Sequence, residues 1–324
     1  METAAFAVLW LSLGLYAVLA GADFGVGFWV LISQASARGD ELRRDAFAYF
    51  SPLWEVNGLF LIFFLMGLLT AFSKAVGVLG RALIPLLLPA LVLFVLRSAM
   101  YALLHHGPER LRPSASWSFG IASVASGVLL GYAAAAPASG DLVGDTLHLR
   151  YYASAVGIAA LPLTLAASAH LGALLLAAHA HLRHSRSTDW FRAGAIASGL
   201  VSLGAAALFT LAVVGQVPHT RERLLGPWSA PMGLAALLVL GGILALVLHR
   251  HGLAVILTAS GYLLGLLAGA FAQLPYLIYP SLTLDQAASP HASISAFVIT
   301  SAIGGPLLLA ALVRALHSFA SARF

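Results

Sequence analysis

The sequence contains no cysteine and very little charge. Among its 324 residues only 9% are charged, and the cations are 16 arginines and a single lysine, Lys74. The absence of cysteine excludes disulfides, thiolate-ligated iron and iron–sulfur clusters within this chain. The scarcity of charge excludes an ordinary soluble domain, in which about 25% of the residues are charged.

What the chain has instead is apolar sequence. Sixty percent of its residues are hydrophobic, and the mean hydropathy is +0.94. These values predict an integral membrane protein. The first apolar stretch runs from Ala4 to Ser33 without a basic segment before it, so it is too long and wrongly flanked for a cleaved signal peptide. No basic run interleaved with aromatic residues occurs, so nucleic acid is not an expected partner.

The apolar stretches predict an all-α, polytopic fold. A membrane span needs about 20 apolar residues, and by that measure the sequence divides into about nine transmembrane helices within a single integral membrane domain, 1–324. Their spacing is compatible with two four-helix bundles plus one extra helix. The predicted spans are 5–33, 52–73, 78–106, 117–137, 151–181, 193–216, 228–248, 253–275 and 292–316.

The distribution of arginine and lysine predicts the orientation. Eleven of these residues fall in the loops on the side that holds the C-terminus, and five fall on the opposite side. Cytoplasmic loops carry the excess of positive charge. We therefore expect a multi-pass membrane protein with its N-terminus outside and its C-terminus in the cytoplasm.

Two carboxylates, Asp23 and Glu55, and one guanidinium, Arg97, fall inside or at the edge of apolar spans. At 1.5 Å per residue, Asp23 is expected about 25 Å from the outer end of its span and Arg97 about 23 Å. Glu55 is expected about 5 Å from the inner boundary. The three charges are therefore predicted to meet at one depth, near the cytoplasmic side.

The three charges allow two interpretations. Ionisable groups inside a membrane mark ion or proton pathways, and two acids beside one cation leave a carboxylate that can take up and release protons. Alternatively, Arg97 pairs with Asp23 only so that two helices can pack, and Glu55 reaches the interface from the end of its helix. Both interpretations stay open at this level.

Two further features are candidate ligand sites, and a third predicts close helix packing. His170, the one histidine well inside a span, could hold a haem iron together with Met100, but a lone membrane histidine more often forms a hydrogen bond across helices. The polar segment 276–283 could line a quinone or lipid groove or form an ordered external loop. Glycines at 261, 265 and 269 predict a face for close helix packing.

Three pieces of sequence together resemble subunit II of the cytochrome bd quinol oxidases. They are collinear and extend over nearly the whole chain. Each piece alone is a weak signal, but the three together are specific. The pieces are Gly-Ala-Asp-Phe-Gly-Val-Gly-Phe-Trp at 21–29; Pro-Leu-Trp-Glu-Val-Asn at 52–57 followed by Leu-Arg-Ser-Ala-Met-Tyr at 96–101; and Tyr-Pro-Ser-Leu-Thr at 279–283 with Ala-Ala-Ser-Pro-His at 287–291.

The resemblance implies a function and a partner. In that family, subunit II binds no haem or metal and packs against a subunit I that carries haems b and d, oxidises quinol and reduces oxygen. The resemblance places Glu55 on a proton route from the cytoplasm, with Asp23 and Arg97 matching the acid and the arginine of the neighbouring motifs. Membrane lipid and quinone are further expected ligands. A structural quinone in this chain, a small accessory subunit and the choice between ubiquinol and menaquinol stay open.

The sequence departs from the family pattern at two places. Gly58 follows Asn57 where many relatives have a larger polar residue, and the end of the third span lacks the aromatic and charged residues common in the family. A proton-coupled secondary transporter that binds an anion near these charges and a membrane scaffold without a proton role are the alternative function classes. The sequence shows no pair of matching broken helices, which argues against the transporter.

Overall fold

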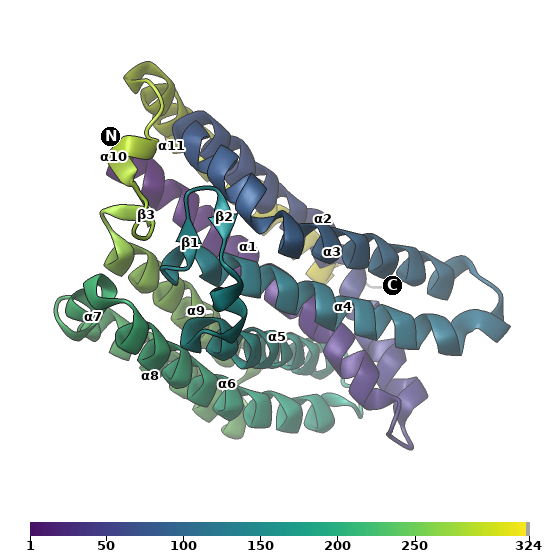
Figure 1. Cartoon of the computed structure of the whole chain (residues 1–324). Helices are drawn as coiled ribbons and strands as arrows, with labels where there is room; N and C mark the ends of the chain where they lie inside the picture. Colours follow the sequence, from purple (N-terminus) through teal and green to yellow (C-terminus); the bar gives the residue numbers. More distant parts are fainter. Residues whose placement is uncertain (322–324) are drawn as a thin grey trace.

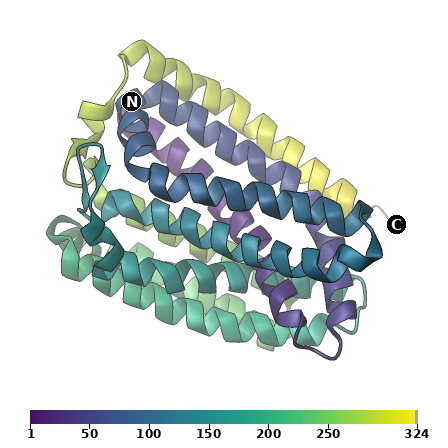
Figure 2. The ribbon, with the colours of Figure 1, turned by 45° about the vertical axis from the view of Figure 1, so that its right-hand side comes forward.

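The computed structural model describes the backbone of residues 1–321, and the side chains of that range except those of residues 49–56, 308–309 and 311–321. Long helices that run roughly side by side dominate it (Figures 1 and 2). In the described backbone these are α1 (Glu2–Ser33), α2 (Gly39–Ala71), α3 (Ser73–His106), α4 (Arg112–Ala135), α5 (Ala155–Leu182), α6 (Thr188–Gln216), α8 (Ser229–Val247), α9 (His251–Gln273) and α11 (His291–Ser321).

Short elements connect the long helices. They are η1 (Glu109–Leu111), η2 (Ala136–Ala138), η3 (Leu149–Ala153), α7 (Pro218–Leu225) and α10 (Leu284–Ala287), with two antiparallel hairpins, β1 (Leu142–Val143) with β2 (Thr146–Leu147) and β3 (Tyr276–Ile278) with β4 (Leu282–Thr283). Seven of the long helices are long and apolar enough to cross a membrane, and α2 and α11 each contain a shorter apolar stretch, Asn57–Ala71 and His291–Leu307. The protein is therefore an all-α, polytopic membrane protein.

The helices form two groups of four and one additional helix. In the first group, α1 packs against α2 and α4, and α3 packs against α4. In the second group, α5 packs against α6 and α9, and α8 packs against α9 and α6. The groups meet where α1 lies against α5, and α11 packs on α2 and α1. Helix α1 therefore contacts both groups and the additional helix.

The start of α2 differs from the prediction. A loop was expected over 34–51 and a span from 52, but the helix begins at Gly39. Its first turns are too polar to be recognised as a membrane span by their hydropathy. They nevertheless favour a helix, because side chains three residues apart form ion pairs: Arg38 with Glu41 at 3.0 Å, and Arg43 with Asp40. The bound Arg38 guanidinium lowers the pKa of the Glu41 carboxyl.

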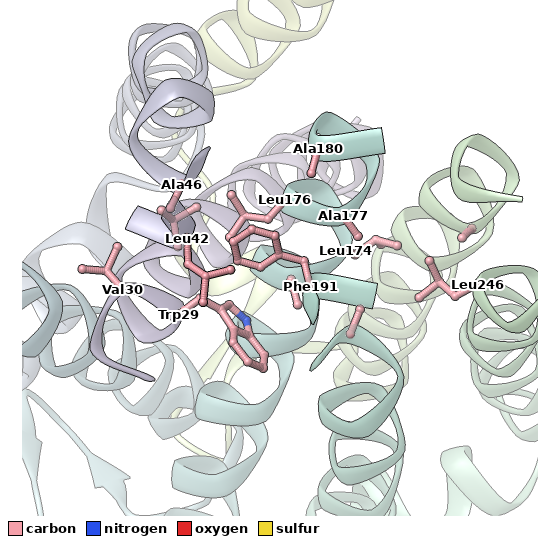
Figure 3. Packing of buried hydrophobic residues seen from close by; sticks show 14 of the residues in the cluster. Trp29, Val30, Leu42, Ala46, Leu174, Leu176, Ala177, Ala180, Phe191 and Leu246 are labelled. Atoms are coloured by element: carbon pink, nitrogen blue, oxygen red, sulfur yellow. The ribbon is translucent and has the colours of Figure 1, made fainter. Parts of the chain in front are cut away.

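One face of this polar segment is buried. Leu42 and Ala46 lie in a core cluster with Val30 of α1 and with Leu176 and Phe191 of the second group. Figure 3 shows these side chains converging from α1, α2, α5 and α6. Burial of one face over successive turns thus stabilises the helix beyond the part that the hydropathy profile detects.

The closest helix contact is between α1 and α5, and it has glycine on both sides. A Cβ on Gly172 would lie 2.5 Å from the carbonyl carbon of Gly25, and a Cβ on Gly25 would collide with the carbonyl oxygen of Ser168. The indole of Trp29 reinforces the crossing, because its Nε1 donates a hydrogen bond to the carbonyl oxygen of Ala169 at 2.8 Å. Small residues permit this approach of two backbones, as is common between membrane helices.

The glycine face predicted at 261, 265 and 269 is only partly used. A Cβ on Gly261 would lie 2.7 Å from Val239, one on Gly265 would lie 3.6 Å from Ala235, and one on Gly269 would meet no described atom within 4 Å. Glycine spacing alone therefore did not identify the tightest contact.

The segment after α9 is an ordered loop, in agreement with one of the two predictions for it. The backbone N–H of Tyr279 donates to the carbonyl oxygen of Pro137 at 2.9 Å, and the amide of Gln273 donates to the same oxygen at 3.3 Å. Thr283 and Gln286 cap α10 reciprocally. The hairpins thus gather at one end of the molecule, together with α7 and the N-terminus (Figure 1).

We expect Gly25→Ala to destabilise the protein by about 1–3 kcal/mol, because the added methyl group forces α1 away from the α5 backbone. The measurement is the free energy of unfolding in mixed detergent micelles. Gly269→Ala is the matched control, since its methyl group would meet open space. Equal stabilities of the two variants would contradict a close crossing at Gly25.

Candidate functional site

The centre of the candidate site is an ion pair between α1 and α3. Nη2 of Arg97 lies 2.7 Å from Oδ1 of Asp23 and 3.3 Å from the carbonyl oxygen of the same residue. Arg97 is 1% exposed and Asp23 is 4% exposed. The structure therefore brings together two of the three charges that the sequence analysis singled out, in a protein-lined interior.

Aromatic rings surround the guanidinium. Its central carbon lies 5.3 Å from the ring centroid of Phe24, 5.8 Å from that of Phe94 and 5.4 Å from that of Phe119. Ring faces carry partial negative charge and attract a cation at this range. The rings also exclude water, so the guanidinium depends on the protein for its partners.

Ser123 of α4 is a further member of the site. Nε of Arg97 donates to its Oγ at 2.8 Å, and that Oγ donates to the carbonyl oxygen of Phe119 at 2.7 Å. Ser123 can approach because Gly27 has no side chain; a Cβ there would collide with the serine. Four helical positions separate Asp23 from Gly27, so the two lie on one face of α1.

Sequence reasoning missed both of these residues. A serine within an apolar helix carries no distinctive signal, because its hydroxyl can bond to its own helix. The position of Gly27 was the available signal: a glycine one turn beyond a buried acid, on the same face, leaves room for a side chain from a neighbouring helix.

One oxygen of the acid has no partner among the described residues. Oδ2 of Asp23 is buried and accepts no hydrogen bond there. A buried carboxylate oxygen without a donor costs free energy. Such an oxygen is a position at which a proton or a water molecule can bind, while the other oxygen stays paired with Arg97.

Glu55 lies on α2, but its side chain falls outside the described residues. On either side of this position α2 contacts α1: Oγ of Ser12 donates to the carbonyl oxygen of Phe60 at 2.9 Å, and a Cβ on Gly39 would lie 2.5 Å from the carbonyl oxygen of Ser33. That Glu55 meets Asp23 and Arg97 at one depth stays a prediction.

The described part of α2 contains a buried polar group two residues further along the chain. Asn57 is 7% exposed, and its Oδ1 has no partner among the described residues. The motif at 52–57 therefore ends in a buried amide.

The surroundings of His170 are those of a histidine that forms a hydrogen bond between helices. Its Nδ1 lies 3.0 Å from the hydroxyl of Tyr262, which lies 2.7 Å from Oγ of Ser202. Its Nε2 faces the backbone of α6, where a Cβ on Gly199 would be 2.9 Å away. Met100 instead packs against the core cluster that contains Trp29. Among the described residues no group of three or more His, Asp or Glu side chains could hold a metal ion.

The sequence profile of a family described as "Cytochrome bd terminal oxidase subunit II" matches residues 1–319. The chain belongs to this family. It is 22% identical over 315 residues, 91% of this chain and 89% of its relative, to the Bacillus subtilis (strain 168) protein named "Putative cytochrome bd menaquinol oxidase subunit II".

The fold is shared with a solved member of the bd oxidases. A chain in "The structure of bd oxidase from Geobacillus thermodenitrificans" matches with a TM-score of 0.85 and 24% identity, over 98% of both chains. Subunit II is part of a respiratory quinol:oxygen oxidoreductase complex that also contains a subunit I. The resemblance found in the sequence motifs is thereby confirmed.

We expect Arg97→Gln to destabilise subunit II by about 3–5 kcal/mol, because it leaves the Asp23 carboxylate buried without a counter-ion. The double variant Asp23→Asn, Arg97→Gln should regain much of that stability, since neither charge then remains. Unfolding free energies in mixed micelles test this.

Arg81→Gln is the matched control for the buried pair. Arg81 pairs with Asp145 at 3.1 Å, but both side chains are at least half exposed, so its removal should cost at most about 1 kcal/mol. A double variant as unstable as Arg97→Gln alone would show that the destabilisation does not come from the unpaired carboxylate.

Proposed function

We propose that this subunit II carries no haem, packs against the haem-bearing subunit I, and contributes Asp23 and Glu55 to a proton route from the cytoplasm, with Arg97 as the fixed charge partner of Asp23. The observation that carries the proposal is the buried ion pair with one carboxylate oxygen left over. Oxygen reduction to water consumes protons, and protons cross a low-dielectric interior by way of ionisable side chains.

The environment of Arg97 supports its role as a fixed charge. The guanidinium bonds to Asp23 and Ser123 and lies between three aromatic rings. Arginine stays protonated in proteins, because its guanidinium loses a proton only at strongly alkaline pH. A permanent cation at one oxygen of Asp23 stabilises the carboxylate, and the second oxygen exchanges the proton.

The positive-inside distribution gives the direction of the route. With the C-terminal end of α1 at the cytoplasm, Asp23 lies ten residues, about 15 Å, from Ser33 at that end. We assign Glu55, on α2, to the same route. Gly58 leaves space on α2 that water or a group of subunit I could occupy, since a Cβ there would meet no described atom within 4 Å.

We expect Asp23→Asn and Glu55→Gln each to lower quinol-driven oxygen consumption by about tenfold or more, because a positioned proton-transfer group contributes about 10²–10⁴-fold. The measurement is oxygen consumption and proton uptake by the purified complex in liposomes, at equal haem content. Glu109→Gln is the matched control, since Glu109 is exposed and pairs only at the surface with Arg112.

The two single variants test the roles of Asp23 and Glu55 separately. Unchanged oxygen consumption and proton uptake in Glu55→Gln would remove that position from the route. If both variants were unchanged, the ion pair would serve only helix packing.

We expect His170→Phe to leave the haem content of the purified complex unchanged, because Nδ1 of His170 is engaged by Tyr262 and Nε2 lies against α6. Pyridine haemochrome spectra of the wild type and the variant, normalised to protein, provide the measurement. Loss of one haem per complex in the variant would contradict the assignment of every haem to subunit I.

A further inference from the structure

The end of the molecule opposite the hairpins carries a helix that begins without a side-chain cap. Helix α9 starts at His251, and its N-cap residue, Arg250, makes no capping hydrogen bond. The first bond of the helix runs from the N–H of Ala254 to the carbonyl oxygen of Arg250 at 3.0 Å. The backbone N–H groups of residues 251–253 precede that bond, and such groups with the helix dipole attract anions.

A buried imidazole stands at the first position of this helix. His251 is 5% exposed, and neither of its ring nitrogens has a hydrogen-bond partner among the described residues. The backbone of His249 lies beside the ring but completes no hydrogen bond with it. A buried polar ring without a hydrogen-bond partner costs free energy. A ligand with an acceptor oxygen beside His251 would accept a hydrogen bond from the ring N–H that the described residues leave unused.

An exposed histidine covers the buried one. The ring of His181, from the end of α5, stacks on that of His251 with centroids 4.3 Å apart and planes 19° apart. Because His181 is exposed and one residue from the end of its helix, rotation of its side chain would open the nitrogens of His251 without moving a helix.

The neighbouring groups are mostly cationic. Arg192 of α6 donates from Nη1 to Nε2 of His249 at 2.8 Å and pairs through Nη2 with Asp189 at 3.0 Å. Its Nε is buried and has no partner among the described residues. Arg250 is exposed next to the helix start. Among the described residues, the charged or ionisable side chains that act on His251 are Arg192, His181 and His249, and Asp189 pairs with Arg192.

The start of α9 is also sterically open. Gly252 is the second residue of the helix, and a Cβ added to it would have no described atom within 4 Å. An anion can therefore approach the free N–H groups from the side of Gly252, while arginine and histidine donors are available around it.

We propose that the start of α9 binds a phosphate-bearing anion. The backbone N–H groups of residues 251–253 and the ring of His251 would donate to its oxygens, and Arg192 and Arg250 would balance its charge. Phosphate suits this donor set, because it offers several strong acceptor oxygens to converging donors. Two sources share this chemistry: the headgroup of an anionic phospholipid at the membrane edge, and free phosphate.

The test compares the purified oxidase complex with variants of subunit II. Gly252→Asp places a carboxylate in the first turn of α9, where it stabilises the helix but repels the anion. Ser114→Asp is the matched control: it adds a carboxylate to the first turn of another helix, α4, at an exposed position. His251→Phe keeps the stacked ring but removes its nitrogens.

Binding is measured with two probes. Native mass spectrometry compares the binding of phosphatidylglycerol, an anionic lipid, with that of phosphatidylcholine. Titration calorimetry measures the binding of inorganic phosphate. We expect Gly252→Asp and His251→Phe to weaken binding by about tenfold or more, and Ser114→Asp to bind as the wild type does. Preference for phosphatidylglycerol alone supports the lipid source, and binding of inorganic phosphate alone supports the free anion.

Two outcomes would overturn the proposal. One is a wild-type complex that binds neither probe. The other is equal binding of a probe by the wild type, Gly252→Asp and His251→Phe. The proton-route proposal does not depend on either result, because oxygen consumption is measured separately.

Discussion

The contact between α1 and α5 sets the geometry of the whole molecule. Lipid tails are as apolar as the side chains of the helices, so membrane helices associate through close packing and hydrogen bonds more than through hydrophobic burial. At Gly25 and Gly172 no side chain separates the two backbones. The hydrogen bond from Trp29 to the α5 backbone maintains the crossing. The two groups of helices therefore meet along a line that α1 defines.

The same turns of α1 carry the ion pair. Gly25 faces α5, whereas Gly27 admits Ser123 from α4, and Asp23 receives Arg97 from α3. Burial of two charges is expensive, and their attraction offsets that cost only when further hydrogen bonds complete their shells. Arg97 has such a shell in Ser123 and the three phenylalanine rings, but Asp23 has one oxygen without a partner. This asymmetry is the basis of our proposal that Asp23 carries the exchangeable proton.

The two ends of the bundle are built differently. At one end, hairpins and short helices are linked by hydrogen bonds from Tyr279 and Gln273 to the backbone of η2. At the other end, the loops between long helices are brief, α9 begins without a cap, and histidines and arginines gather there. Backbone hydrogen bonds therefore link the connecting segments at one end, whereas arginine and histidine side chains lie near the start of α9 at the other.

Hydropathy and charge scarcity by themselves determined the class of protein, the approximate spans, and the importance of Asp23 and Arg97, since a charge in an apolar span is costly wherever the chain folds. The motifs around them also identified the family. The start of α2, the partnership of Gly27 with Ser123 and the glycines that are actually in contact were decided only by the tertiary structure. Each of these depends on which residue of another helix lies opposite, and a local sequence pattern does not record contacts between residues that are far apart in the chain.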